Sequence, residues 1–174
     1  NWESASKEDD SWLYLPALQK VNRIASADRS GSFMGSDFTY SDIDGFELED
    51  FNYKIVKEND VVDGKDCWVI ESTPKNKKVI AKTGYLKSIQ WVRKDIHFVV
   101  KNRILVKKGK KVKLFAAKDI QKVDGVWTAK ILQMITTKNK KLVHKSIFQL
   151  KNIKYNTNVE DSIFETEVMQ RGIQ

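Results

Sequence analysis

The chain is poor in the residues on which disulfides, sharp turns and metal sites depend. Its 174 residues include one cysteine, two prolines, eight glycines and two histidines. The single cysteine, Cys67, excludes an intrachain disulfide and a metal site built from several thiolates. Because it lies in the apolar run 67–70, we interpret it as a small buried side chain. The low proline and glycine content excludes a collagen-like chain, and no apolar run approaches the roughly 20 residues of a membrane-spanning helix.

Sequence motifs of catalysis are missing as well. His97 and His144 lie in alternating stretches, where an exposed or hydrogen-bonded histidine is commoner than a metal ligand. The sequence has no His-Glu-x-x-His or Cys-x-x-Cys spacing, no glycine-rich phosphate loop and no Gly-x-Ser-x-Gly motif. The acidic clusters at 9–10 and 47–50 are interpreted as solvated turns or strand exteriors. We therefore expect no enzymatic activity, no metal site and no cofactor.

Positive charge is abundant but unevenly placed. Lysine and arginine outnumber aspartate and glutamate 31 to 23, for a net charge of +8, yet residues 1–60 carry −7 and residues 75–154 carry +20. Only five of the 31 basic residues are arginine, the residue that nucleic-acid-binding surfaces favour. We therefore interpret the lysines first as the solvated outer face of a sheet. The alternative is a basic sheet that binds an anionic partner, such as a nucleic acid, a glycan or an acidic protein.

Alternation of apolar and polar residues is the strongest structural signal. One run places on a single face Ile96, Phe98, Val100, Asn102, Ile104 and Val106. Further β-rich stretches occupy residues 66–73, 88–93, 111–114, 126–136 and 141–153. Strands with one apolar and one lysine-rich face are typical of an antiparallel sheet with one side in water.

Residues that favour tight turns separate these stretches. Asp-Gly pairs at 44–45, 63–64 and 124–125 supply the positive φ angles of two-residue hairpin turns. Lysine-rich tips at 108–110 and 138–140 predict two further hairpins. We expect a meander of seven to nine strands in which sequence neighbours pair.

Helices are expected to be few and short. Residues 35–42, with Ser36 or Asp37 as the N-cap, and residues 159–164 are the two candidates. The chain has 18 aromatic residues, so a curved meander with little helix to fill it favours an apolar cavity. Periodicity leaves a fully packed barrel interior open as the alternative.

One loop carries a pair of large apolar residues. Residues 26–37 are mostly small and polar apart from Phe33 and Met34, which are flanked by Gly31 and Gly35. Loops seldom present two such side chains without a use. The pair either plugs one end of the barrel or contacts a ligand.

Several segments together resemble a known family. They look like the signature of the bacterial outer-membrane lipoprotein-sorting proteins, the LolA/LolB-like periplasmic carriers. The segments are Trp12–Leu18, Val21–Ile24, Asp28–Phe38, Trp91–Asp95 and Val123–Trp127. Of these the loop Ser30-Gly31-Ser32-Phe33-Met34-Gly35-Ser36-Asp37-Phe38 is the longest and most specific, and the matches extend over nearly the whole chain.

The resemblance implies a mainly β fold, an unclosed antiparallel β-barrel or half-barrel meander whose short helices cap an apolar cavity. It implies a periplasmic carrier that binds acyl chains of lipoproteins or other lipids for transfer towards the outer membrane. An inner-membrane transporter and transient contact with a membrane surface are the expected partners, and nucleic acid is not. Residues 1–174 are expected to form one domain, trimmed of the N-terminal helix and first strands that family members usually carry.

Within this fold we expect the apolar cavity to be lined by Trp12, Tyr14, Phe33, Met34, Phe38, Trp91 and Trp127. The four indole and phenol side chains would line or brace the concave face, and the three residues of the loop would form a gate at one mouth. Gly31 and Gly35 would give this gate loop its freedom to move, and methionine suits a pocket that accepts variable chains.

Overall fold

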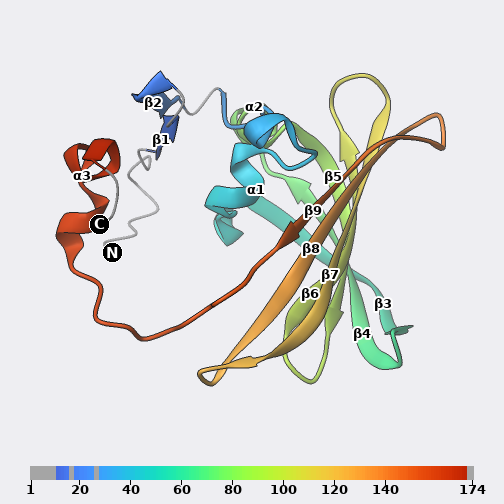
Figure 1. The fold of residues 1–174 in the computed structure, drawn as a ribbon. Helices are drawn as coiled ribbons and strands as arrows, with labels where there is room; N and C mark the ends of the chain where they lie inside the picture. Colours follow the sequence, from blue (N-terminus) through green and yellow to red (C-terminus); the bar gives the residue numbers. More distant parts are fainter. Residues whose placement is uncertain (1–10, 16–17, 26–27, 172–174) are drawn as a thin grey trace.

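The computed structural model describes residues 11–15, 18–25 and 28–171. Its body is one antiparallel sheet of seven strands paired in sequence order. The two edge strands, β3 and β9, do not pair with each other, so the sheet is not closed into a barrel. The strands are β3 (Phe51–Val62), β4 (Lys65–Pro74), β5 (Tyr85–Arg93), β6 (Phe98–Val106), β7 (Lys111–Val123), β8 (Val126–Lys138) and β9 (Lys141–Gln149). Figure 1 shows that the sheet is strongly curved. The predicted unclosed antiparallel meander is therefore confirmed.

Four of the predicted turns are hairpin turns. Each lies at the expected position, between β3 and β4, β6 and β7, β7 and β8, and β8 and β9. Asp124 and Gly125, for example, have φ angles of 47° and 84°, as a two-residue hairpin turn requires. The fifth prediction is wrong, because Gly45 is the C-cap of a short helix and joins no two strands.

Residues paired across the strands form rows of side chains on each face of the sheet. One row on the concave face consists of Gln90, Asn102, Phe115, Met134 and Ser146, which are paired from β5 to β9. Directly opposed residues in an antiparallel sheet project to the same side, so each row forms a continuous strip. The neighbouring concave row consists of Ser88, Ile104, Lys113, Thr136 and His144.

A capping segment lies over one end of the concave face (Figure 1). It comprises η3 (Phe33–Gly35), α1 (Tyr40–Asp44) and η4 (Leu48–Asp50), and α2 (Lys77–Thr83) lies beside it. The core joins this segment to the sheet through Phe38, Tyr85, Ile104 and Met134. Apolar side chains thus hold the capping segment against β5, β6 and β8.

The predicted first helix lies slightly later in the chain than expected. Thr39, and neither Ser36 nor Asp37, caps α1, and it forms a reciprocal capping box with Asp42. Helix α2 was not predicted, although Asn76 at its N-cap accepts a hydrogen bond from the Val79 amide at 3.0 Å. The second predicted helix is confirmed in part by η5 (Asp161–Phe164).

The two ends of the described chain lie together. β1 (Ser11–Leu15) and β2 (Lys20–Ile24) form a separate two-stranded sheet, and α3 (Thr166–Arg171) contacts both strands. An extended segment leads from β9 to η5 and α3 (Figure 1). Within the described ranges, no helix combines the length and the apolar character that crossing a membrane demands.

Candidate functional site

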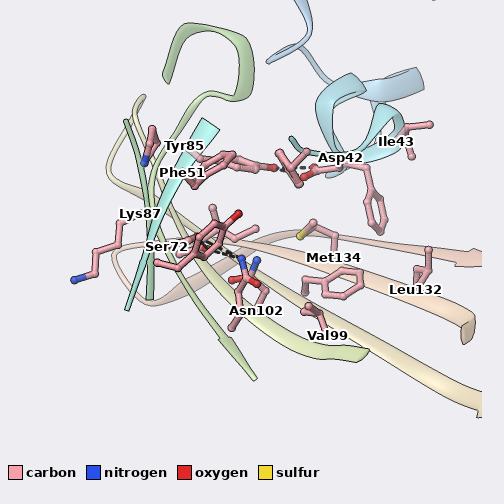
Figure 2. Close-up of a pocket in the computed structure, with 18 residues that line it drawn as sticks. Asp42, Ile43, Phe51, Ser72, Tyr85, Lys87, Val99, Asn102, Leu132 and Met134 are labelled. Carbon is pink, nitrogen blue, oxygen red and sulfur yellow. Dashed lines mark hydrogen bonds between the residues drawn. The ribbon is translucent and has the colours of Figure 1, made fainter. Parts of the chain in front are cut away.

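A cavity of about 290 Å³ lies on the concave face, between the sheet and the capping segment (Figure 2). Strands β3 to β8 supply its floor, and residues 38–46 supply part of its wall. Its lining is mostly apolar and includes Phe38, Ile43, Phe46, Phe51, Tyr53, Val99, Ile104, Phe115, Leu132 and Met134. Binding pockets for small molecules measure roughly 300–1,000 Å³, so this cavity is near the lower end of that range.

The cavity has a buried floor and an exposed mouth. Met134 and Ile104 on the floor are 2% and 3% exposed. Ile43, Phe46 and Tyr53 are 46%, 45% and 45% exposed although they line the same cavity. Large apolar side chains at an opening cost free energy in water. This arrangement therefore offers an apolar surface to a ligand that enters from solvent.

Polar side chains on the floor mostly satisfy one another. The hydroxyls of Ser72 and Ser88 are 2.7 Å apart, and Gln90 Nε2 donates to them at 3.3 and 3.1 Å. The exception is Asn102, whose Oδ1 atom is buried without a hydrogen-bond partner in the described structure. A buried acceptor without a donor is costly. Asn102 thus marks a point at which the cavity can accept a donor from a bound molecule.

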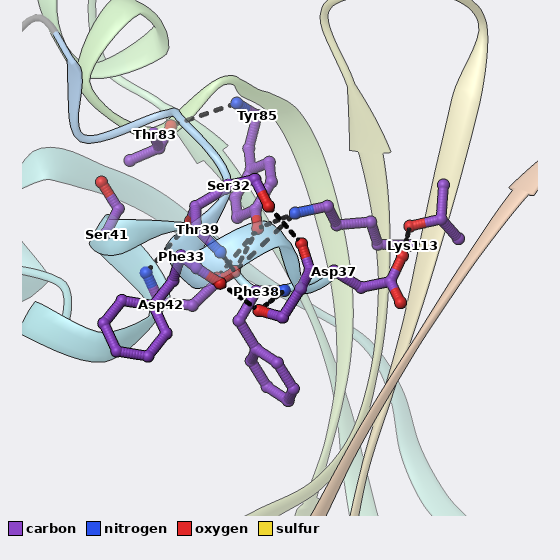
Figure 3. A network of polar contacts seen from close by, with 12 residues as sticks. Ser32, Phe33, Asp37, Phe38, Thr39, Ser41, Asp42, Thr83, Tyr85 and Lys113 are labelled. Carbon is purple, nitrogen blue, oxygen red and sulfur yellow. Dashed lines mark hydrogen bonds and ion pairs between the residues drawn. The ribbon is translucent and has the colours of Figure 1, made fainter. Parts of the chain in front are cut away.

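Two buried carboxylates attach the capping segment to the sheet (Figure 3). Asp37 accepts hydrogen bonds from Thr136 Oγ1 and Ser146 Oγ, the latter at 2.8 Å, and its Oδ2 lies 2.7 Å from His144 Nδ1. Burial tends to raise the pKa of Asp37, but these hydrogen bonds and the charge of His144 together hold it below its ordinary value of 3.8. Asp37 is therefore an anionic anchor between the capping loop and β8 and β9.

Asp42 is the second anchor. It accepts from the phenol of Tyr85 at 2.7 and 2.9 Å and from the Thr39 amide at 2.8 Å. Lys113 Nζ donates to the same phenol at 3.2 Å and lies 3.9 Å from Asp42 Oδ2. Burial first, and the charge of Asp42 second, raise the pKa of Tyr85 strongly, so its hydroxyl stays protonated. Burial likewise lowers the pKa of Lys113, although the charges of Asp42 and Asp37 oppose this effect.

Of the seven side chains predicted to line the cavity, Phe38 does so. Phe33 instead packs against the core cluster, with its ring 6.1 Å from that of Phe148. Met34 is 68% exposed and has a φ angle of 49°. Trp12 and Tyr14 belong to β1, in the separate two-stranded sheet. None of these four residues lines the cavity on the concave face.

The prediction that Trp91 and Trp127 line the concave face needs correction. Gln90 faces the cavity, so its neighbour Trp91 points to the opposite side of the sheet, where Lys101 Nζ lies 4.6 Å from its ring centroid. Trp127 lies near the start of β8, is 38% exposed and has no part in the cavity lining. The correction follows from the register, because residues of the same strand alternate between the two faces.

Movement of the predicted gate loop stays a prediction. Gly35 has a φ of +74°, which favours glycine. A Cβ atom at Gly31 would lie 2.9 Å from the carbonyl oxygen of Asp28, so close packing explains that glycine.

Sequence reasoning missed several residues of the cavity. Asn102 lies in the alternating run on the same face as Ile104, and this shared face was a usable signal. Phe115 and Met134 follow from pairing with Asn102, which needs the strand register. Asp42 and Tyr85 are 43 residues apart, and no local pattern joins them.

Comparisons with known proteins agree with this architecture. A family model described as an uncharacterized protein matches residues 1–171. A search of the curated proteins found no match.

Three solved structures are similar to the chain. An outer membrane lipoprotein-sorting protein domain from Vibrio parahaemolyticus is 29% identical, with a TM-score of 0.73, over 95% of this chain and 67% of that one. A DUF1329 family protein from Desulfovibrio piger is 32% identical, with a TM-score of 0.78, over 94% of this chain and 66% of that one. A LolA superfamily protein from Nitrosomonas europaea is 16% identical, with a TM-score of 0.54, over 91% and 67%, and it shows the fold alone. The chain thus spans about two thirds of the length of each structure it matches.

Proposed function

Because the chain belongs to a LolA-like family, we propose that it is a carrier that binds an acyl chain of a lipoprotein or of another lipid in the cavity on its concave face. The observation that carries this proposal is the apolar cavity of about 290 Å³ beneath the capping segment. Burial of each ligand methylene contributes about 0.8 kcal/mol, so a few methylenes supply useful affinity without any specific polar contact.

The form of the cavity supports a carrier that both takes up and releases its cargo. The floor is buried, whereas Ile43 and Phe46 at the mouth are half exposed and belong to the capping segment. A chain that enters here covers apolar surface on the protein as well as its own. The same opening provides an exit that needs no disruption of the sheet.

The cellular setting is part of the same proposal. The described similarity to a lipoprotein-sorting domain supports a location in the periplasm and transfer of cargo towards the outer membrane. An inner-membrane transporter would deliver the cargo, and transient contact with a membrane surface would accompany its uptake or release. The role is one of binding and transfer, with no enzymatic step.

The test is uptake of a fluorescent fatty-acid probe by the purified protein, combined with mass spectrometry of an organic extract of the preparation. We expect saturable uptake, and weaker uptake in the Phe46→Asp variant, since this substitution places a charge at the mouth. The matched control is Leu142→Asp, because Leu142 is 67% exposed on β9 and lies outside the cavity lining. Absence of uptake by the unaltered chain, with no lipid in the extract, would refute the proposal.

A further inference from the structure

A second cavity lies next to the first, at the end of the sheet where the β6–β7 and β8–β9 hairpins turn. It measures about 630 Å³, and Phe38 and Tyr85 line both cavities. Its remaining walls come from the loop at 30–39, the end of α2 and the adjoining ends of β6, β7, β8 and β9. The two cavities therefore meet at two aromatic side chains.

The second cavity differs from the first in its chemistry, because four lysines line it: Lys107, Lys108, Lys111 and Lys113. The first three are exposed, and within the described ranges none of them has an ion pair or a side-chain hydrogen bond. We refer to this cavity as the lysine pocket. These four lysines line a concave space instead of a flat surface.

The acidic groups nearby already have partners within the protein. Asp37 lines the lysine pocket, but Thr136, Ser146 and His144 surround its carboxylate. Asp42 is engaged by Tyr85 and by Lys113, as Figure 3 shows. The four lysines and one aspartate of the lining sum to +3. Lys107, Lys108 and Lys111 have no counter-ion in the described chain, so they are available to pair with an anionic group of a ligand.

We propose that the lysine pocket binds a phosphate or carboxylate group, and that this group is the head of an amphiphile whose chain occupies the apolar cavity. The second half of this inference rests on the proposed function, and the first half does not. Several ammonium groups around one concave site are suited to an oxyanion, since each supplies a charge-assisted hydrogen bond. Partial enclosure strengthens each pairing relative to an exposed surface pair. Because Phe38 and Tyr85 line both cavities, a head group in the lysine pocket would lie next to a chain in the apolar cavity.

The experiment compares three probes by titration calorimetry on the whole chain: dodecyl phosphate, dodecanol and inorganic phosphate. We expect dodecyl phosphate to bind on the order of tenfold more tightly than dodecanol at low salt. This preference shrinks as salt is added, because the site is open to solvent. The variant Lys107→Gln/Lys111→Gln should lose most of the preference and keep the affinity for dodecanol.

The control variant, Lys118→Gln/Lys154→Gln, removes the same charge from exposed positions outside both cavities and should bind like the unaltered chain. One outcome separates the two halves of the proposal: dodecyl phosphate and dodecanol bind equally tightly, and inorganic phosphate binds to the unaltered chain but not to the pocket variant. This result would support the oxyanion site and overturn its assignment to the head of a lipid. Equal effects of the pocket and control variants overturn the oxyanion site itself. Failure of the proposed function gives a different result, because dodecanol then does not bind at all, whether or not inorganic phosphate binds.

Discussion

The phenol oxygen of Tyr85 lies 2.7 Å from one carboxylate oxygen of Asp42 and 2.9 Å from the other. Tyr85 begins β5 and Asp42 belongs to α1, so this contact joins the capping segment to the sheet. Both side chains also line the apolar cavity. The wall of the proposed binding site therefore depends on a polar contact as well as on apolar packing.

Substitution of Tyr85 by phenylalanine tests this contact. Tyr85→Phe keeps the ring and removes the hydroxyl that donates to Asp42 and accepts from Lys113. A hydrogen bond to a charged group contributes roughly 1.5–3 kcal/mol, so we expect the free energy of unfolding in urea to fall by about 2 kcal/mol. Tyr53→Phe is the matched control, because Tyr53 lines the same cavity but is 45% exposed. Equal stability of the two variants would contradict the role assigned to the contact.

Asp37 should make stability depend on pH in the acid range. Its pKa in the folded protein lies below the ordinary value of 3.8, so the unfolded chain binds the proton more readily. The stabilisation is complete at pH values above about 5, where the carboxyl is ionised in both states. It is lost as the pH falls through the lower pKa of the folded state. The free energy of unfolding between pH 6 and pH 2 should therefore drop less steeply for Asp37→Asn than for the unaltered chain.

A second aspartate provides the control for this pH prediction. Asp95 also has a lowered pKa, through its hydrogen bond with Arg93, but it is exposed on a turn. Asp95→Asn should change the acid slope little, since exposed ion pairs contribute little to stability. A difference curve for Asp37→Asn that is flat with pH would show that His144, Thr136 and Ser146 do not stabilise the charged form.

Asn102 should be replaceable by an apolar residue at little cost. Its Oδ1 atom is buried without a partner in the described structure, so Asn102→Leu removes an unpaired acceptor from the cavity floor. We expect unfolding free energy to be unchanged or higher by up to about 1 kcal/mol, and fatty-acid uptake to be retained. Gln90→Leu is the contrasting variant, because it leaves Ser72 and Ser88 without their amide donor. A loss of stability in Asn102→Leu as large as in Gln90→Leu would contradict this prediction.

The strands of the sheet could be predicted from the sequence because each one shows its own alternation of apolar and polar residues. Alternation and turn residues are local, so the hairpin turns predicted at 63–64, 108–110, 124–125 and 138–140 lie between consecutive strands, as expected. Helix α2 was missed because its seven residues include no full amphipathic repeat.

The cavity was predicted less well because its residues depend on register and on distant contacts. Trp91 was expected on the concave face, yet the alternation of side chains along β5 places Gln90 there. Phe38, which was named from its loop motif, lies in the lining of this cavity. The pairing of Asp42 with Tyr85 required the capping segment to fold back on β5, which no spacing in the sequence encodes.

Trp91 should take no part in cargo binding. Its indole lies on the face opposite the cavity, where Nε1 donates to Asp60 at 2.9 Å and Lys101 covers the ring. Trp91→Phe removes the donor to Asp60 but leaves the cavity lining unchanged, so fatty-acid uptake should match that of the unaltered chain. Phe115→Ala, in contrast, removes a ring from the cavity floor and should lower uptake several-fold. Because Phe115→Ala also costs stability, both variants are compared at a temperature where circular dichroism shows them folded. Reduced uptake in Trp91→Phe would return the binding site to the opposite face of the sheet.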